Sequence, residues 1–124
     1  LLLLMGVSSM RVIRLWTRRS FGVRPRGLES LTITSYEPAG YYKVHHDGFD
    51  RQFTFLCYIN DAFEGGATTF PVLGCSITPR AGRLVAWRNS LSKGRPRNEM
   101  LHYAEPVISG RKIVVQQWTR YVGV

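Results

Sequence analysis

The segment from Tyr41 to Asp47 contains a histidine and an aspartate with the spacing of metal ligands. Its sequence is Tyr-Tyr-Lys-Val-His-His-Asp. In an extended strand, side chains two residues apart share a face, so His45 and Asp47 point the same way. His46 points to the opposite side, where we expect it to be exposed. One further imidazole would complete a two-histidine-one-carboxylate set, which leaves positions on an iron ion open for other ligands.

The third ligand can come only from His102, because the chain contains three histidines. A single histidine in a strand is usually a core or surface residue with no metal role. Here, however, Lys112 follows it by ten residues, beyond a turn at Ser109-Gly110. A hairpin of that length can place an imidazole and an inward lysine in one cavity. A buried ammonium group needs an anion, which the distal carboxylate of an iron-chelating 2-oxo dicarboxylic acid would supply.

Short strands separated by Gly/Pro turns must position these residues. From Glu29 onward, β-branched and apolar segments alternate with turns, and residues 90–98 are expected to form a polar, basic loop. The predicted strands are 31–36, 41–47, 53–59, 67–70, 76–78, 84–87, 101–107 and 112–121. About eight short, regularly spaced strands indicate a mainly β fold, and a jelly roll closed around an interior pocket fits best.

The residues before Glu29 have a different pattern. Ser8-Ser9 can cap a short helix through about Ser20, with Met10, Ile13 and Trp16 on one face, and Gly22 would end it. An Arg-rich transit peptide is the alternative interpretation. Residues 1–8 are predicted to be a leader or fragment end, and 9–124 a single domain with its core at 29–121. The apolar start is too short to span a bilayer, so no transmembrane segment is expected.

The net charge of +9 is high for 124 residues and raises the question of an anionic partner. Six of the seventeen Lys/Arg residues lie between Arg11 and Arg26, and the others are scattered among turns and strand ends. This distribution favours a solvated face or a targeting region over a dedicated nucleic-acid surface. The two cysteines form no metal motif. Cys57 is predicted to be a buried free thiol, with a bridge to Cys75 left open.

Several sequence motifs carry a resemblance to a known family. They are Glu29-x-Leu31, Tyr36-Glu37-Pro38-x-Gly40-x-Tyr42-x-x-His45-x-Asp47, Arg51-x-x-Thr54-Phe55-Leu56-x-Tyr58-x-Asn60-Asp61, Glu64-Gly65-Gly66-x-Thr68-x-Phe70-Pro71 and His102…Pro106-Val107…Gly110-x-Lys112. Over residues 10–121 the chain resembles the catalytic domain of prolyl 4-hydroxylases. These are Fe(II)- and 2-oxoglutarate-dependent dioxygenases with a double-stranded β-helix core.

The resemblance implies roles for the residues that would bind the metal and the cosubstrate. His45, Asp47 and His102 match the iron ligands. Lys112 matches the residue that pairs with the C5 carboxylate of 2-oxoglutarate. The partners that hydrogen-bond this carboxylate are matched by Tyr36 and Thr68.

The resemblance also implies which residues lie near the substrate. Tyr42 and Trp118 match positions that contact the substrate proline or its peptide, with core packing as the alternative role. Arg51 matches an arginine at the substrate end of the site and is counted among the catalytic residues. Glu29 matches an acid near that arginine.

The implied activity is hydroxylation of peptidyl proline, as in procollagen-proline 4-dioxygenases. Fe(II) is the cofactor, 2-oxoglutarate and O2 are cosubstrates that yield succinate and CO2, and ascorbate is expected to support turnover. The alternatives are a hydroxylase of another substrate (a lysyl side chain, a small molecule or a nucleobase) and a non-catalytic jelly-roll binding module. The lysine anchor favours a peptide over nucleic acid, which the charge leaves open. The resemblance favours the secretory pathway, with the cytoplasm also open.

Overall fold

The structure is a computed structural model that describes residues 3–4, 15 and 18–123 of the chain. It is mainly β, with antiparallel pairing between neighbouring strands. The strands in the described residues are β1 (Leu3–Leu4), β2 (Thr32–Tyr36), β3 (Tyr42–His45), β4 (Arg51–Tyr58), β5 (Phe63–Gly65), β6 (Thr68–Phe70), β7 (Cys75–Ile77), β8 (Arg83–Arg88), β9 (Ser90–Ser92), β10 (Arg95–Pro96), β11 (His102–Ala104), β12 (Val107–Gly110) and β13 (Lys112–Arg120). Two short 3₁₀ helices, η1 (Pro25–Gly27) and η2 (Asn98–Met100), complete these elements.

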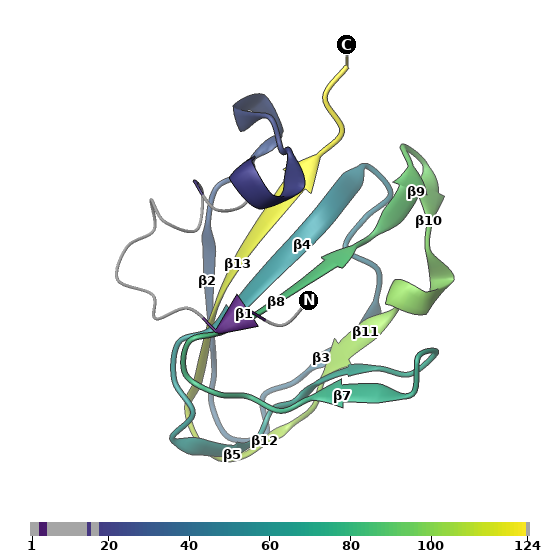
Figure 1. Ribbon diagram of the computed structural model, residues 1–124. Coiled ribbons are helices and arrows are strands. Elements are labelled where there is room, and N and C mark those ends of the chain that lie inside the picture. The colour runs from purple at the N-terminus through teal and green to yellow at the C-terminus, as the bar shows by residue number, and fades with distance from the viewer. Residues whose placement is uncertain (1–2, 5–14, 16–17, 124) are drawn as a thin grey trace.

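Two sheets enclose the interior, as the jelly-roll prediction requires. The larger sheet has the strand order β1-β8-β4-β13-β2, and the smaller has the order β3-β11-β6-β7. Figure 1 shows the larger sheet running diagonally beside β3, β11 and β7 of the smaller one. Two short pairs, β12 with β5 and β10 with β9, form separate two-stranded sheets.

Strand register decides which side chains face the interior. Lys112 of β13 lies opposite Tyr36 of β2, and further along β13 Trp118 lies opposite Thr54 of β4. Because side chains alternate along a strand, the even-numbered residues of β2, β4 and β13 share one face. This face packs against the smaller sheet around Leu56, as part of a core cluster of buried side chains. The cluster comprises Leu56, Tyr58, Phe70, Val85, Trp87, Met100 and Val114.

Strand β4 is buried on both faces, which explains why its sequence is almost continuously apolar. Its even-numbered residues face the space between the sheets, whereas Phe55 and Cys57 pack with Leu84 on the outer side. Phe21, from the helical residues 18–21, covers this outer face and contacts Phe55 with ring centroids 5.1 Å apart. A strand covered on both sides reads as a hydrophobic run rather than an alternating one.

The predictions for the N-terminal region are tested only in part. Residues 15 and 18–21 are helical, and Gly22 follows with a φ of 62°, a left-handed conformation that favours glycine and ends helices. The proposed cap at Ser8-Ser9, the apolar positions Met10, Ile13 and Trp16, and most of the leader 1–8 lie outside the described residues. No helix in the described part is long and apolar enough to cross a membrane.

Several sequence predictions about the loops and strand ends are wrong. Residues 90–98 are not an irregular loop, because they contain the hairpin β9–β10 and the start of η2. The predicted strand 101–107 divides into β11 and β12, and β12 turns away to pair with β5. Strand β3 ends at His45, and His46 is half-buried beside Phe49 rather than fully exposed.

Candidate active site

Strands from the smaller sheet bring the three predicted metal ligands together. His45 on β3 and His102 on β11 are register partners, and Asp47 lies two residues beyond His45. Asp47 Oδ1 lies 3.2 Å from His45 Nε2 and 3.5 Å from His102 Nε2. One ligand atom from each residue lies within 4.8 Å of the others. Three such atoms around one point are the donor set that a two-histidine-one-carboxylate iron site needs.

Backbone hydrogen bonds fix the orientation of both imidazole rings. His45 Nδ1 lies 2.7 Å from the Lys43 carbonyl, and His102 Nδ1 lies 2.8 Å from the Met100 carbonyl. Since a carbonyl can only accept, each Nδ1 carries the proton and donates it. Nε2 is therefore the nitrogen that faces Asp47 in both rings: when protonated it donates to the Asp47 carboxylate, and in the neutral ring it offers the lone pair that binds a metal.

Asp47 is buried and yet remains ionised. Burial by itself would raise the pKa of its carboxyl group, but hydrogen bonds with His102, His45 and Thr54 outweigh this effect and hold the pKa well below its usual range. Oδ2 accepts a hydrogen bond of 2.5 Å from the Thr54 hydroxyl, and Thr54 Oγ1 accepts one of 2.8 Å from Asn89 Nδ2. The carboxylate thus presents Oδ1 to the histidines and Oδ2 to the protein interior.

The pKa of His45 reflects the same contacts. Burial lowers it, but the hydrogen bond with Asp47 and the bond to the Lys43 carbonyl outweigh burial, so the pKa lies above its ordinary value.

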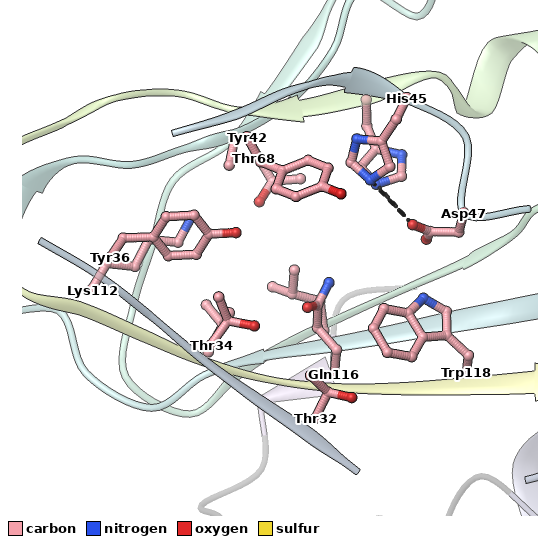
Figure 2. Close-up of a pocket in the computed structure, with 14 residues that line it drawn as sticks. Thr32, Thr34, Tyr36, Tyr42, His45, Asp47, Thr68, Lys112, Gln116 and Trp118 are labelled. Carbon is pink, nitrogen blue, oxygen red and sulfur yellow. Dashed lines mark ion pairs between the residues drawn. The ribbon is translucent and has the colours of Figure 1, made fainter. Parts of the chain in front are cut away.

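A cavity of about 200 Å³ extends from these ligands into the space between the two sheets. Figure 2 shows His45, Asp47 and Trp118 at one end, Tyr36 and Lys112 at the other, and Thr34 and Gln116 between them. The lining residues are Thr32, Thr34, Tyr36, Tyr42, His45, Asp47, Leu56, Thr68, His102, Ala104, Lys112, Val114, Gln116 and Trp118. Nearly all of the predicted site residues therefore line one cavity.

Lys112 is a buried cation without a carboxylate partner among the described residues. The residue is 1% exposed, and its Nζ donates a 2.7 Å hydrogen bond to the Gly66 carbonyl. The ammonium also lies over the rings of Tyr36 and Tyr58, at 4.8 and 5.7 Å from their centroids. Burial lowers the pKa of Lys112 to about 8, against a smaller opposing effect of Glu105. A buried ammonium group without a carboxylate partner can bind the carboxylate of a ligand.

Gly66 makes this arrangement possible. Its φ is +67°, and an added Cβ would lie 3.0 Å from Lys112 Cδ and 3.1 Å from the Phe63 ring. A side chain here would be strained and would crowd the lysine that the Gly66 carbonyl holds.

The hydroxyl groups around Lys112 include one that sequence reasoning did not single out. Tyr58 is fully buried, and its hydroxyl shares a 2.7 Å hydrogen bond with Thr68 Oγ1. Burial raises the pKa of Tyr58 to about 12, so it stays protonated. Tyr36 is half-buried, and burial raises its pKa as well. Tyr58 stands within one of the family motifs, but only the register of β4 shows that it points to the interior, near Lys112.

Arg51 and Glu29 form an ion pair next to Asp47 and Trp118. Arg51 Nε and Nη2 each donate a 2.8 Å hydrogen bond to the Glu29 carboxylate, and Nη1 donates one of 2.9 Å to the Asp47 carbonyl. The guanidinium stacks over the Trp118 ring at 4.1 Å. Glu29 also pairs with Arg120 at 3.0 Å. Hydrogen bonding to Arg51 holds the pKa of Glu29 below its usual value, against an opposing effect of burial.

The cysteines lie apart from this cavity. Cys57 is buried and Cys75 is exposed, and neither is in a disulfide. Burial raises the pKa of the Cys57 thiol, so the prediction of a buried free thiol is confirmed.

A family model described as the 2OG-Fe(II) oxygenase superfamily matches residues 31–120, where 2OG denotes 2-oxoglutarate. The chain belongs to this superfamily. This oxygenase domain is 34% identical over 109 residues to prolyl 4-hydroxylase subunit alpha-2 of Gallus gallus, with 78% of the chain and 20% of that protein covered. It is 32% identical over 120 residues to a putative prolyl 4-hydroxylase of Acanthamoeba polyphaga mimivirus, with 82% of the chain and 49% of that protein covered. The chain spans about a fifth of the length of the animal prolyl 4-hydroxylase subunits that it matches.

Solved structures share the fold of this oxygenase domain. It matches the viral collagen prolyl hydroxylase of Paramecium Bursaria Chlorella virus-1, solved as a 2-oxoglutarate complex, with a TM-score of 0.82 and 27% identity. That match covers 98% of the chain and 79% of the viral protein. A Pseudomonas putida prolyl-4-hydroxylase shares the fold with a TM-score of 0.60 and 22% identity, covering 91% of the chain and 63% of that protein.

Proposed function

We propose that the chain is the catalytic domain of an Fe(II)- and 2-oxoglutarate-dependent hydroxylase of peptidyl proline. The observation that carries the proposal is the cavity that holds a His-Asp-His set at one end and, at the other, the buried ammonium of Lys112, which has no carboxylate partner among the described residues. A dicarboxylic acid that chelates a metal by one end and meets a cation with the other suits these two ends. The prolyl 4-hydroxylase relatives support proline as the target.

His45, Asp47 and His102 would hold the iron through Nε2, Oδ1 and Nε2. When bound, the iron couples the reduction of O2 to the decarboxylation of 2-oxoglutarate to succinate and CO2, and supplies the oxidising power for substrate hydroxylation. The imidazoles contribute neutral donors because their Nδ1 protons are held by backbone carbonyls. The protein's task is to fix these ligands and to leave the remaining positions accessible.

Lys112 would pair with the C5 carboxylate of 2-oxoglutarate. Its ammonium is already oriented by the Gly66 carbonyl and by the rings of Tyr36 and Tyr58. Tyr36 from the larger sheet and Thr68 from the smaller sheet also line this cavity and carry hydroxyl groups. Leu56 and Val114 line the cavity between the two ends, where apolar side chains keep water away from the bound cosubstrate.

Two aromatic side chains support a peptide at the metal end. Tyr42 is 49% exposed and lines the cavity, and Trp118 lines it beside Asp47. The Trp118 Nε1 atom is buried and has no hydrogen-bond partner among the described residues. Figure 2 shows this nitrogen on the side of the ring nearest Asp47. An extended proline-rich peptide has free carbonyl groups and suits aromatic walls with a donor of this kind.

For Arg51 and Glu29 the contacts within the protein support a second role beside the substrate role that the resemblance implies. Each nitrogen of the Arg51 guanidinium already donates within the protein, to Glu29 or to the Asp47 carbonyl. We assign to both residues the role of supporting Asp47 and Trp118, and the Arg51→Met variant described below separates this role from direct substrate contact.

Succinate formation tests the proposed function. The chain, loaded with Fe(II), 2-oxoglutarate and ascorbate, should form succinate faster with a proline-rich peptide than with a matched peptide in which alanine replaces proline. The modified peptide should gain one oxygen atom per succinate formed. Equal stimulation by both peptides, or stimulation by an oligonucleotide or a lysine-rich peptide instead, would contradict the proline assignment. Succinate formation without peptide preference would leave the cosubstrate chemistry standing.

A further inference from the structure

Asp47 has two carboxylate oxygens with different surroundings. Oδ1 faces the two histidine Nε2 atoms at 3.2 and 3.5 Å, whereas Oδ2 accepts the Thr54 hydroxyl at 2.5 Å. The Asp47 side chain is 3% exposed, so water cannot readily replace that donor. Oδ1 is therefore the oxygen placed to bind a metal, and Oδ2 is the oxygen hydrogen-bonded within the protein.

The direction of the hydrogen bonds behind Asp47 is fixed by chemistry. Thr54 has one hydroxyl proton, and the short contact with a carboxylate requires that this proton point to Oδ2. The hydroxyl oxygen can then only accept from Asn89, whose Nδ2 lies 2.8 Å away. The hydrogen bonds thus run in series from Asn89 through Thr54 to Asp47, and successive hydrogen bonds with one direction strengthen each other.

The two donors stand on rigid, buried elements. Thr54 is 0% exposed and lies on β4 between its register partners Trp118 and Trp87. Asn89 is 3% exposed at the β8–β9 junction. Its backbone N–H donates to the Gln52 carbonyl at 2.9 Å, and its carbonyl accepts from Arg97 N at 2.8 Å. A polar pair built into the core in this way has little freedom to follow a moving carboxylate.

We propose that Thr54 and Asn89 are positioning residues that reserve Asp47 Oδ2 and so keep this carboxylate a one-oxygen ligand. The inference rests on the proposed function, because it concerns the same metal site. A carboxylate that bound through both oxygens would occupy one of the positions that 2-oxoglutarate and O2 need. Without the hydroxyl of Thr54, Oδ2 would have no hydrogen-bond donor among the described residues, and its charge would favour a second contact with the bound metal.

Cobalt(II) binding tests the proposal without relying on turnover. Thr54→Val keeps the shape of the side chain but removes the donor, and Thr54→Ser restores it. We expect Thr54→Val to weaken Co(II) binding about 10- to 100-fold and to change the visible absorption of the bound ion, which depends on coordination number. Thr54→Ser should recover the affinity and spectrum of the unmodified chain. Thr119→Val is the matched control, because Thr119 is equally buried but accepts from Phe53 N, away from Asp47.

A double-mutant cycle distinguishes an effect transmitted through the Asn89–Thr54–Asp47 hydrogen bonds from an effect of side-chain packing alone. Asn89→Ala should weaken Co(II) binding less than Thr54→Val, and it should add little further loss once the Thr54 hydroxyl is absent. If Thr54→Val does not fold, comparison of Asn89→Ala with Thr54→Ser still tests whether these hydrogen bonds affect metal binding. Folded Thr54→Val or Asn89→Ala protein with unchanged Co(II) affinity and spectrum would overturn the proposal. Failure of the unmodified chain to bind Co(II) would instead contradict the proposed function.

Discussion

His45 and His102 face each other as register partners on β3 and β11, and each hydrogen-bonds through Nδ1 to the carbonyl two residues before it. Two residues far apart in the sequence thus adopt the same tautomer by the same local contact. The ring centroids lie 4.3 Å apart, and Phe70 and Trp87 pack around His102. The backbone acceptor takes the Nδ1 proton of each imidazole, so Nε2 is the nitrogen that faces Asp47.

Lys112→Met should separate the cosubstrate site from protein stability. The pKa of Lys112 falls from 10.5 to about 8 on burial, which corresponds to a cost on the order of 3 kcal/mol at pH 7. Methionine removes this cost but loses the bond to Gly66, so we expect the ligand-free variant to be more stable by about 1–3 kcal/mol. Its affinity for 2-oxoglutarate should fall at least about 100-fold. Urea denaturation and calorimetric titration measure the two effects, and a destabilised variant would contradict this account of Lys112.

The titration of Lys112 predicts a pH dependence of stability. Between pH 8 and 10.5 the unfolded chain still binds the proton that the folded protein has lost. The free energy of unfolding of the ligand-free protein therefore rises with pH across this window through this group. Tyrosines also titrate there, so the quantity to measure is the difference between the unmodified chain and Lys112→Met. That difference should shrink as the pH rises from 8 to 10.5, and a constant difference would be the contradicting result.

Binding of 2-oxoglutarate should show the opposite dependence on pH. The C5 carboxylate needs the protonated ammonium, so above pH 8 binding takes up a proton and the affinity falls by up to about tenfold per pH unit. Calorimetry of the Mn(II)-loaded protein in buffers of different ionisation enthalpy measures this uptake. Proton uptake that persists in Lys112→Met would show that another group is responsible.

Trp118→Phe tests the substrate side of the cavity. Phenylalanine keeps an aromatic wall and the stacking surface for Arg51 but removes the unpartnered Nε1 donor. We expect the KM for a proline-rich peptide to rise about 2- to 10-fold through the loss of one hydrogen bond, with 2-oxoglutarate binding unchanged. A matching fall in 2-oxoglutarate affinity would place Trp118 in the cosubstrate site instead.

Arg51→Met should act mainly on the structure around Asp47. The substitution removes both hydrogen bonds to Glu29 and the one to the Asp47 carbonyl, and leaves the half-buried Glu29 with only Arg120. We expect a loss of about 1–3 kcal/mol in the free energy of unfolding and weaker metal binding. Arg120→Met is the control, because its side chain is more exposed. If Arg51→Met changed only the KM for the peptide, Arg51 would be a substrate residue, as the resemblance implied.

The sequence predicted the site better than it predicted the edges of the sheets. The His-x-Asp triplet, His102 and Lys112 carry their chemistry in their residue types and spacing, and these two properties were enough to locate them. The β9–β10 hairpin was missed because its strands are polar and only two or three residues long. Pairing of β5 with β12 was missed because it depends on close backbone approach at Gly65 and Gly110, where no hydrophobic pattern exists.

The contacts of Thr54 and Asn89 could not be predicted from the sequence. Thr54 belongs to one of the family motifs, but nothing in that motif indicates its hydrogen-bond partners, and Asn89 follows Trp87-Arg88 with no motif around it. Their meeting at Asp47 depends on the register between β4 and β8, which no local pattern specifies. Tyr58 is similar, because its place beside Lys112 follows from the pairing of β4 with β13.

Anaerobic titration of the chain with Fe(II) and 2-oxoglutarate tests the central claim most directly. If His45, Asp47 and His102 hold iron and Lys112 holds the distal carboxylate, a weak visible metal-to-ligand charge-transfer band should appear. It should be absent in Asp47→Ala and His102→Ala, require far more 2-oxoglutarate in Lys112→Met, and persist in His46→Ala, whose side chain lies outside the cavity. Folded protein that shows no band, or a band that survives in His102→Ala, would contradict the assignment of this cavity as an iron and 2-oxoglutarate site.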